Sequence, residues 1–389
     1  MSAGTDHRSV AAQLLPPAWL DPPKVVLITG AGRALGAQVA ARLARDPRIE
    51  RIIGIDALAP NDVAAALLPD RMEFIRADVR TAEPAKILIT SRAEAVVHLA
   101  IVSAADGHSG GRAGMKEQNV IGTMQLLAAC QQAPELHKLI VRSSTAAYGA
   151  SFRDPAVFTE STEPRAVPRG GFARDVLDIE GYVRGFRRRR PDVAATVLRF
   201  APFIGELANT TLTHYFEQPI VPTVLGRDPR LQFVHVDDAM EILYRSVVGT
   251  HPGTFNVAGP GTITLSQAVR RSGRLAMPVL EPGMSALAGF AKSIGPRGFS
   301  LDQLDLFVHG RVVDTSRLVE EFDFEPRSTA TAFADFLRGH ATGAVLPRAA
   351  VQAAERTILE QIRQVRAAAA AGASAAANLN PRRRSGAPR

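Results

Sequence analysis

The amino-acid sequence predicts an α/β fold, with a doubly wound parallel sheet followed by a smaller C-terminal lobe. Short apolar runs rich in valine and isoleucine are separated by longer stretches of helical periodicity. The runs lack the polar–apolar alternation of half-exposed strands, which indicates a parallel sheet buried on both faces. A length of 389 residues, 46% hydrophobic and 22% charged, suits one large α/β domain or two closely joined lobes.

Six strands and two helices can be placed in order. The strands are predicted over 24–30, 51–58, 72–79, 95–100, 138–144 and 194–200. Clear helical periodicity covers 35–46 and 119–133. After Pro202 the pattern loosens into loops and short helices. Two later strands, over 232–236 and 253–259, are predicted to return to the main sheet or its edge.

Both ends of the chain differ from its centre. Residues 1–22 form a polar leader without a basic segment and a long apolar run, so no signal peptide is predicted. Beyond about residue 342 we expect one charged helix and then an alanine-rich, disordered tail. No run approaches the roughly 20 apolar residues of a membrane-spanning helix. The single cysteine, Cys130, excludes an internal disulfide framework, and a cytoplasmic location is predicted.

The formal net charge is +8, and arginine supplies most of the positive charge. Part of the excess lies in the run over 184–190 and in the C-terminal tail. A phosphate-rich partner, such as nucleic acid or an acidic membrane face, would match this charge. No stacking aromatic residues interleave with the arginine run, which argues against nucleic acid. Compositional bias, with arginines that complement a helix dipole, explains the excess better.

The stretch VVLITGAGRALGAQVA is typical of a strand, a glycine-containing turn and a helix that bind a dinucleotide. Gly30 suits the tight turn, and Gly36 suits the close approach of helix and strand. The N–H groups at the helix start can hold a pyrophosphate. The second strand ends at Asp56, whose carboxylate would accept both hydroxyls of an adenosine ribose and repel a 2′-phosphate. These features predict NAD over NADP; a purely structural turn is the alternative. No metal site is predicted.

In combination, the motifs resemble those of the extended short-chain dehydrogenase/reductase family, the NAD-dependent sugar-nucleotide epimerases and dehydratases. The matching segments, from about residue 24 to residue 339, are TGAGRALG, GIDAL, FIRADVR, VVHLA, NVIGTMQLL, VRSSTAAYG, ATVLRFAPFIG, QFVHVDDAMEIL, GTFNVAGP and VVDTSRLVEEFDFEP. The resemblance implies a Rossmann-type fold, NAD as cofactor, a nucleotide-sugar as ligand and a homodimer paired through helices beside the active site. It extends to a subgroup of high-GC bacterial proteins labelled UDP-glucose 4-epimerase-like.

The resemblance also assigns cofactor residues, position by position. They are Gly30, Arg33, Leu35, Gly36, Asp56, Asp78, Val79, Leu99, Ala100 and Asn119. Asp78 and Val79 resemble the pair beside the adenine ring, and Leu99 and Ala100 belong to the loop over the nicotinamide ribose and phosphates. Arg33 replaces the middle glycine of the family's turn, where a long side chain could crowd the pyrophosphate, pair with it or meet a 2′-phosphate.

On the substrate side, Arg230 precedes a strand where the family often places an arginine against the substrate diphosphate. A planar guanidinium can bind phosphate in a bidentate manner, although a surface arginine is the alternative. Asn209 could contact a phosphate or close a turn. Asp237 and Asp238 are predicted to cap the helix that follows them.

The catalytic helix departs from the family pattern. The family's Tyr-x-x-x-Lys pair shares a helix face; the tyrosine exchanges a proton with a substrate hydroxyl, and the lysine lowers the tyrosine pKa. Matching Glu180 to the family's glutamate places Phe172 at the tyrosine position and Val176 at the lysine position. A shifted alignment does not restore the pair, because no tyrosine lies between Tyr148 and Tyr182.

No lysine lies between Lys138 and Lys292 either. Instead the helix carries an apolar stripe, which consists of Phe172, Val176, Ile179, Val183 and Phe186. Arg174 and Asp175 are expected to point off this stripe.

Other residues are candidates for the missing proton chemistry. Ser144 matches the family's catalytic Ser/Thr and would orient a substrate hydroxyl, although it could merely close a turn. His98, His214 and His235 are the better candidates for a substitute acid or base, since imidazole titrates near neutrality. His98 could also be a satisfied strand-end histidine. Nothing in the sequence brings any of the three to a nicotinamide.

The sequence therefore predicts a leader over 1–22, an NAD-binding Rossmann domain over 23–205 with returning strands near 231–258, mainly a substrate lobe over 206–340, and a C-terminal helix and basic tail over 341–389. The predicted function is that of a UDP-glucose/galactose 4-epimerase-like protein with impaired or altered catalysis. A non-catalytic nucleotide-sensing or scaffolding protein is the alternative. An NADP-dependent carbonyl reductase is a further one, suggested only by Arg33.

Overall fold

The protein is described by a computed structural model of the whole chain. It describes residues 21–103, 111–165, 167–168, 171–206, 208, 210–280, 301–340, 356 and 360. The predicted leader, apart from residues 21 and 22, and nearly all of the predicted C-terminal helix and tail lie outside these residues.

The main sheet has seven parallel strands in the order β11-β6-β5-β4-β1-β2-β3, which confirms the predicted doubly wound α/β fold. The strands are β1 (Val25–Thr29), β2 (Arg51–Asp56), β3 (Met72–Arg76), β4 (Ala95–His98), β5 (Lys138–Ser144), β6 (Ala194–Phe200) and β11 (Gly253–Val257). All six predicted strands of the first 200 residues are present.

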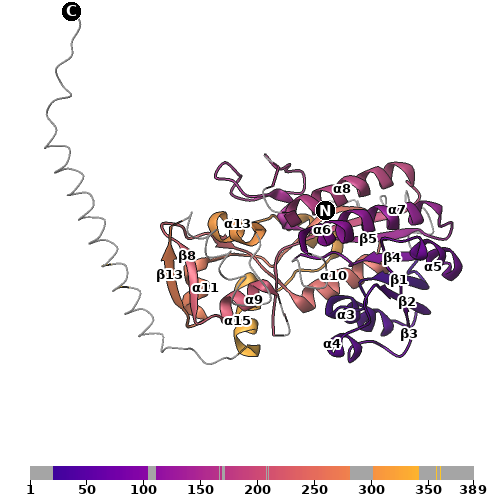
Figure 1. The fold of residues 1–389 in the computed structure, drawn as a ribbon, viewed down its shortest axis with the longest axis horizontal. Coiled ribbons are helices and arrows are strands. Elements are labelled where there is room, and N and C mark those ends of the chain that lie inside the picture. The colour runs from indigo at the N-terminus through magenta and orange to yellow at the C-terminus, as the bar shows by residue number, and fades with distance from the viewer. Residues whose placement is uncertain are drawn as a thin grey trace, which may run out of the picture.

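Helices cover both faces of this sheet, because its strands are apolar on both sides (Figure 1). One face packs against α3 (Ala34–Ala44), α10 (Val236–Val248) and α14 (Ser316–Phe322). The other packs against α5 (Glu83–Ser91), α7 (Gly122–Gln132) and α8 (Gly171–Arg189). Strand β1 contributes Val26 and Ile28 to the first core and Leu27 to the second.

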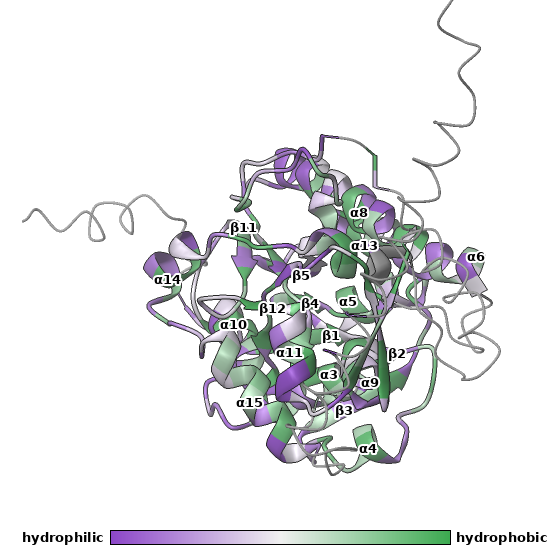
Figure 2. Cartoon of the chain, turned by 90° about the vertical axis from the view of Figure 1, so that its left-hand side faces the viewer, coloured by the Kyte–Doolittle hydropathy of each residue, from purple (hydrophilic) through white to green (hydrophobic). Residues whose placement is uncertain are grey.

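A smaller region with its own aromatic core follows β6. It contains α9 (Thr211–Glu217), α11 (Leu265–Arg271), α13 (Leu301–His309), α15 (Thr329–Gly339) and two short sheets, β13 (Leu275–Val279) with β8 (Ile220–Val224) and β12 (Ile263–Thr264) with β9 (Arg230–Leu231). Figure 2 shows hydrophobic residues gathered around the main sheet and hydrophilic ones on outer elements such as α11. No helix of the described residues is long and apolar enough to cross a membrane.

One strand prediction is wrong. Residues 253–259 supply β11 at the edge of the main sheet, but 232–236 do not join that sheet. Their strand, β10 (Val234–His235), pairs instead with β7 (Phe203–Ile204). Pro202 has no N–H to donate to a ladder and separates β7 from β6, and its carbonyl accepts from the Val234 N–H at 3.1 Å.

Candidate functional site

The carboxyl ends of the parallel strands carry most of the predicted site residues. Strands β1 and β4 are neighbours; the chain continues from β1 to β2 on one side and from β4 to β5 on the other, so the strand order reverses between them. Such a switch point leaves a crevice in which doubly wound proteins bind ligands. The turn after β1, the ends of β2 and β5, and the loop after β4 surround it. We call this region the crevice.

The turn after β1 lies tightly against the loop after β4. Gly30 has φ +77°, and a Cβ on it would lie 2.8 Å from the backbone nitrogen of Ala100 and 2.9 Å from the carbonyl carbon of Leu99. A Cβ on Gly36 would overlap the carbonyl oxygen of Gly30. Glycine is therefore required at both positions, as predicted for a close turn. Leu35 packs its side chain against the core under α3.

Asp56 faces Arg33 across the crevice. Asp56 is only 5% exposed, and its Oδ2 has no hydrogen-bond partner within the described residues. The Nε of Arg33 lies 3.9 Å from that oxygen. Burial raises the pKa of Asp56, and the charge of Arg33 opposes this rise. A buried carboxylate with an unused acceptor fits a diol, such as the two hydroxyls of a ribose.

Two neighbours complete this end of the crevice. A Cβ on Gly32 would lie 3.2 Å from Asp56 Oδ2, so the glycine leaves room beside the carboxylate. Asp78, just after β3, holds Arg80 through a 2.6 Å contact between Oδ2 and Nη2, which lowers the pKa of Asp78. Val79 is buried and packs against Gly122 at the start of α7.

His98 fixes the loop after β4 and is not placed to act as a base. Its Nδ1 lies 2.7 Å from Thr29 Oγ1 and its Nε2 lies 2.9 Å from Thr123 Oγ1. Thr29 Oγ1 in turn accepts the N–H groups of Leu99 and Ala100, both at 3.2 Å. Burial lowers the pKa of His98 to about 3, so the ring stays neutral. His98 is thus a strand-end histidine whose two ring nitrogens both have hydrogen-bond partners.

Asn119 ties the same loop to α8. It lies in a π-helical turn, η1 (Glu117–Ile121), between α6 (Gly111–Lys116) and α7. Its amide exchanges two hydrogen bonds with the backbone of Val102, at 2.8 and 2.9 Å, and its Nδ2 donates to Asp175 at 3.1 Å. Such π turns often occur at functional sites.

Asp175 lies beside the apolar stripe and is buried, which the helix pattern alone did not indicate. Its side chain is 1% exposed and binds both terminal nitrogens of Arg112 at 2.6 Å. Arg112 also donates to the carbonyl of Gly171 at 2.8 Å. The residue next to the apolar stripe is therefore buried against α6 and η1, and it fastens the first turn of α8 to them. Arg174 is exposed, as expected.

Ser144 ends β5 and caps the short helix η2 (Thr145–Tyr148), accepting the Ala146 N–H at 3.1 Å. Its hydroxyl hydrogen remains available to another acceptor. The Tyr148 hydroxyl is engaged elsewhere: it lies 2.7 Å from Asn256 Oδ1 and 2.8 Å from Arg199 Nη1. Burial raises the pKa of Tyr148, which disfavours a phenolate there.

The apolar stripe of α8 is buried, as predicted. Phe172 is 7% exposed, and the remaining members are fully buried in the core between α8 and the sheet; they are Val176, Ile179, Val183 and Phe186. Leu139 and Val141 of β5 belong to the same core. The stripe presents no group that can exchange a proton.

Arg142 is a candidate that the sequence analysis missed. Its Nη1 donates to the carbonyl of Ile101 at 2.9 Å, and its guanidinium lies 5.4 Å from the Phe203 ring centre. Burial, and secondarily the charge of Arg33, lower the pKa of Arg142 to about 10. An arginine within a central strand, two residues before Ser144, is the feature that could have revealed it.

The remaining candidates lie in the smaller region. Arg230 is exposed on β9 and donates to the Ala156 carbonyl at 2.9 Å. Asn209 lies outside the described residues. His214 lies 2.9 Å from Glu217, and His235 caps α10 by accepting the Asp237 N–H at 3.1 Å.

The prediction that Asp237 and Asp238 cap α10 is therefore wrong: both lie in its first turn, where their charges still favour the helix dipole. His235 lies 2.9 Å from Arg327 Nη1 and is held within the smaller region. No group of three or more potential metal ligands occurs among the described side chains.

Comparisons with known proteins place this geometry in context. The NAD dependent epimerase/dehydratase family pattern matches residues 26–258. An uncharacterized protein of Mycobacterium tuberculosis is 44% identical over 318 residues, which cover 82% of this chain and 84% of that protein.

Solved structures share the fold. UDP-glucose 4-epimerase of Thermotoga maritima, in a structure with UDP-glucose, has a TM-score of 0.62 at 20% identity and covers 81% of this chain and 98% of its own. UDP-glucuronic acid 4-epimerase of Bacillus cereus, in complex with UDP-glucuronic acid and NAD, has a TM-score of 0.63 at 16% identity with the same coverage.

Proposed function

This chain belongs to the NAD dependent epimerase/dehydratase family, and from that premise we propose that it binds NAD and a nucleotide-sugar in the crevice, with impaired or altered catalysis. The observation that carries the proposal is the burial of Phe172 and Val176 on α8. In the register given by Glu180 these residues stand where the family's proton-exchanging tyrosine and its lysine are expected. The chain would then bind the ligands of a UDP-glucose/galactose 4-epimerase-like protein but turn them over much more slowly.

The crevice residues fit NAD. The unused Oδ2 of Asp56 would accept the adenosine ribose hydroxyls, and the N–H groups at the start of α3 would hold the pyrophosphate. Arg33 and Arg142 would add positive charge beside the phosphates. When bound, NAD supplies a hydride acceptor for a sugar hydroxyl.

Removal of the hydroxyl proton is the step for which the chain lacks a group. Ser144 would orient a sugar hydroxyl through its own hydroxyl. Phe172 would exclude water from the same place, but a phenyl ring takes no proton, and Val176 supplies no charge. A positioned acid–base usually contributes about 10²–10⁴-fold in rate. We therefore expect 4-epimerase turnover that is very low or absent.

A second candidate function is a nucleotide-sensing or scaffolding protein. The clamp of Arg112, Asp175 and Asn119 favours it, because these residues fix α8 without offering a reactive group to the ligand. The NADP-dependent reductase is favoured less, since Arg33 faces Asp56, whose carboxylate would repel a 2′-phosphate.

Calorimetric titration of the full chain with NAD, NADP, UDP-glucose and UDP-galactose tests the binding part. We expect NAD to bind at least about tenfold more tightly than NADP, because a carboxylate opposes the additional phosphate. Stronger NADP binding would favour the reductase. Absence of binding by any nucleotide would contradict both the NAD proposal and the sensor.

The variant with Phe172→Tyr and Val176→Lys tests the catalytic part. If the rest of the crevice is competent, this double substitution should raise 4-epimerase turnover well above that of the unchanged chain. Binding of NAD without any rescue would favour the sensor. Ordinary turnover by the unchanged chain, in an assay that converts UDP-galactose to UDP-glucose, would refute impaired catalysis.

A further inference from the structure

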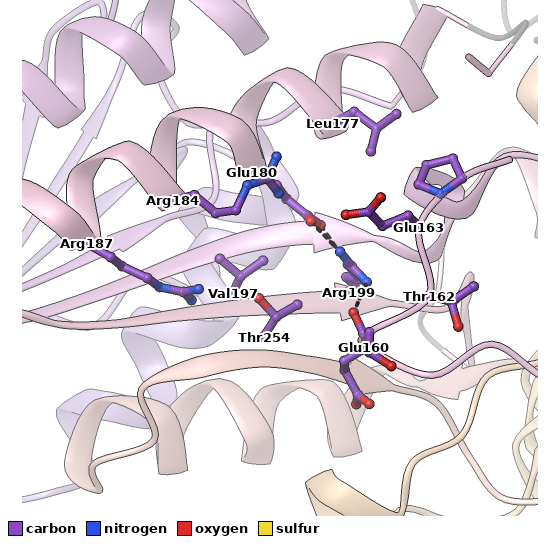
Figure 3. Close-up of a pocket in the computed structure, with 12 residues that line it drawn as sticks. Glu160, Thr162, Glu163, Leu177, Glu180, Arg184, Arg187, Val197, Arg199 and Thr254 are labelled. Atoms are coloured by element: carbon purple, nitrogen blue, oxygen red, sulfur yellow. Dashed lines mark hydrogen bonds and ion pairs between the residues drawn. The ribbon is translucent and has the colours of Figure 1, made fainter. Parts of the chain in front are cut away.

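A second cavity, separate from the crevice, lies between α8 and the edge of the main sheet (Figure 3). Its volume is about 490 Å³, within the range of small-molecule sites. Residues of α8, β6, β11 and the loop 160–164 line it. It opens on the α8-facing side of β6 and β11 rather than at the strand ends, because Val197 and Thr254 lie in its wall as paired neighbours in the two strands.

At one end of the cavity the charged side chains, Glu180 and Arg199, are paired with each other. Glu180 is buried and holds Arg199 through two contacts of 2.9 and 2.6 Å, and it also accepts the Ser143 hydroxyl at 2.6 Å. Arg199 further donates to the Glu160 carbonyl at 3.2 Å. The charges of Glu180 and Arg199 therefore neutralise each other at this end of the cavity.

The other end carries positive charge without a matching anion. The Nη2 of Arg187 donates to the carbonyls of Ala195 and Gly253 at 2.9 and 2.6 Å. No carboxylate pairs with Arg187 or Arg184 within the part of the chain that the structure describes. Burial lowers the pKa of Arg187 to about 10; the charge of Glu180 opposes this shift, and the charges of Arg317 and Arg184 add to it. Cations crowded together in this way are stabilised by a bound anion.

The remaining lining groups differ in character. Leu177 and Val197 give an apolar wall, and Thr254 offers a hydroxyl beside Arg187. At the opposite rim the carboxylate of Glu163 is exposed and can accept hydrogen bonds from hydroxyl or amino groups. Figure 3 shows Arg184 and Arg187 on the same side of α8, across the cavity from the loop with Glu160 and Glu163.

We propose that this cavity binds a small anionic metabolite, with a phosphate or carboxylate group at Arg184 and Arg187 and hydroxyl groups toward Glu163. A guanidinium pair matches either oxyanion by charge-assisted hydrogen bonds. A sugar phosphate or a sugar acid has both parts. The site is independent of NAD, since none of its residues belongs to the crevice.

Calorimetric titration of the full chain, saturated with NAD and UDP-glucose to fill the crevice, tests the proposal. The probes are glucose 1-phosphate, glucuronate and neutral glucose. We expect one or both anions to bind and glucose not to bind. The comparison of the two anions decides whether phosphate or carboxylate is recognised. Failure of both anions to bind overturns the proposal.

Three substitutions locate the binding. Arg184→Ala removes an exposed side chain for which the described residues supply no hydrogen-bond or ion-pair partner, and we expect about tenfold weaker anion binding, the usual loss for one charge-assisted hydrogen bond. Arg188→Ala, an exposed arginine of the same helix that does not line the cavity, and Asp56→Asn in the crevice should leave the affinity unchanged. Equal affinity in Arg184→Ala and the unchanged chain, or weakening by Asp56→Asn, overturns the proposal.

Discussion

The burial of Asp56 determines how this carboxylate affects both stability and binding in the crevice. Its carboxylate is almost fully enclosed, yet one oxygen has no partner among the described residues. A buried carboxylate oxygen without a partner destabilises the unliganded protein, and a hydrogen-bond donor on a bound ligand removes this cost. Under the proposed function, Asp56 is a binding residue whose buried charge lowers the stability of the unliganded protein.

Replacement of Asp56 by asparagine separates these two effects. We expect NAD to bind about tenfold or more weakly, because a charge-assisted hydrogen-bond acceptor is lost. The unliganded variant should be more stable at neutral pH by about 1 kcal/mol, since the buried charge is gone. Because the pKa of Asp56 is raised in the folded protein, its buried charge lowers the free energy of unfolding. This destabilisation is complete above the native pKa and absent below the ordinary value of 3.8.

Calorimetry with NAD and urea denaturation at pH 7 and pH 3.5 measure both effects. Glu73→Gln, an exposed carboxylate of β3 paired with Arg51, is the control and should change neither NAD affinity nor the pH dependence. An unchanged NAD affinity in Asp56→Asn would rule out the ribose contact.

His98 gives a prediction about acid stability. Burial lowers its native pKa to about 3, whereas the unfolded imidazole titrates near 6.5. Between these values the unfolded chain binds more protons, so the free energy of unfolding falls as pH falls, by up to about 1.4 kcal/mol per pH unit from this residue. In His98→Asn that part of the slope should be absent when unfolding is followed from pH 6.5 to pH 4. An identical slope in the two proteins would contradict the enclosure of His98.

At the residue scale, sequence reasoning found the groups that follow strand ends and missed those whose direction depends on packing. Gly30, Asp56 and His98 are all found at the strand ends where they were predicted. The burial of Asp175 could not be predicted, because a helical wheel gives the direction of a side chain but not the neighbours, here Arg112 and Asn119, that it meets there. Arg142 was overlooked because its guanidinium meets Ile101 only after β4 and β5 have paired.

At the scale of elements, α8 is the part on which the proposed function rests. It buries an apolar stripe against the sheet on one side, and Asp175 anchors its first turn to α6 and η1 on another. Phe172 and Val176, which we propose stand at the family's tyrosine and lysine positions, belong to the hydrophobic core. The same positions on one side of α8 cannot both pack in the core and supply proton-exchanging side chains.

Val176→Lys alone should be costly for that reason. Val176 is fully buried, and an ammonium group there lacks a partner, so we expect a loss of about 3 kcal/mol or more in the free energy of unfolding. Asp178→Lys makes the same new side chain on the exposed side of α8 and should cost less than about 0.5 kcal/mol. Chemical denaturation compares the two. Equal stabilities would mean that position 176 opens to water or to a bound ligand.

The Arg112–Asp175 contact can be tested by a double-mutant cycle. Arg112→Ala leaves the buried Asp175 carboxylate without its main partner, and we expect a loss of about 2–4 kcal/mol. Adding Asp175→Asn should recover part of this loss, because Asn119 can still bond to an amide. Denaturation of the four proteins gives the coupling free energy. A coupling near zero would show that the contact does not hold α6 on α8.

Element prediction succeeded where periodicity was strong and failed where the chain bends. The six strands of the first 200 residues are mostly apolar and were predicted. The helix expected over 119–133 begins instead with the π-helical turn η1, which the buried hydrogen bonds of Asn119 accompany. Residues 232–236 have a strand pattern but pair with the short β7, because Pro202 interrupts the edge beside them.

At the scale of the whole molecule, one sheet carries the two regions for which we propose ligands. The crevice at the strand ends has a tight glycine turn and a buried carboxylate oxygen without a partner among the described residues. The cavity beside α8 lies on a face of the same sheet, and its lining residues are distinct from those of the crevice. The alternation of apolar strands with helices, together with the family motifs, sufficed to predict the fold. The arginine run that includes Arg184 and Arg187 was noted in the sequence, but the cavity could not be predicted, because it forms only where α8, β6, β11 and the loop 160–164 come together.

The rate at which the NAD-saturated chain converts UDP-galactose to UDP-glucose is the most direct measurement of the central claim. With NAD binding verified in the same sample, we expect a rate at least about 10²-fold below that of an active family epimerase assayed alongside. The reason is that Phe172 and Val176 stand where the proposal places the family's tyrosine and lysine. A rate equal to that of the active epimerase would contradict the claim.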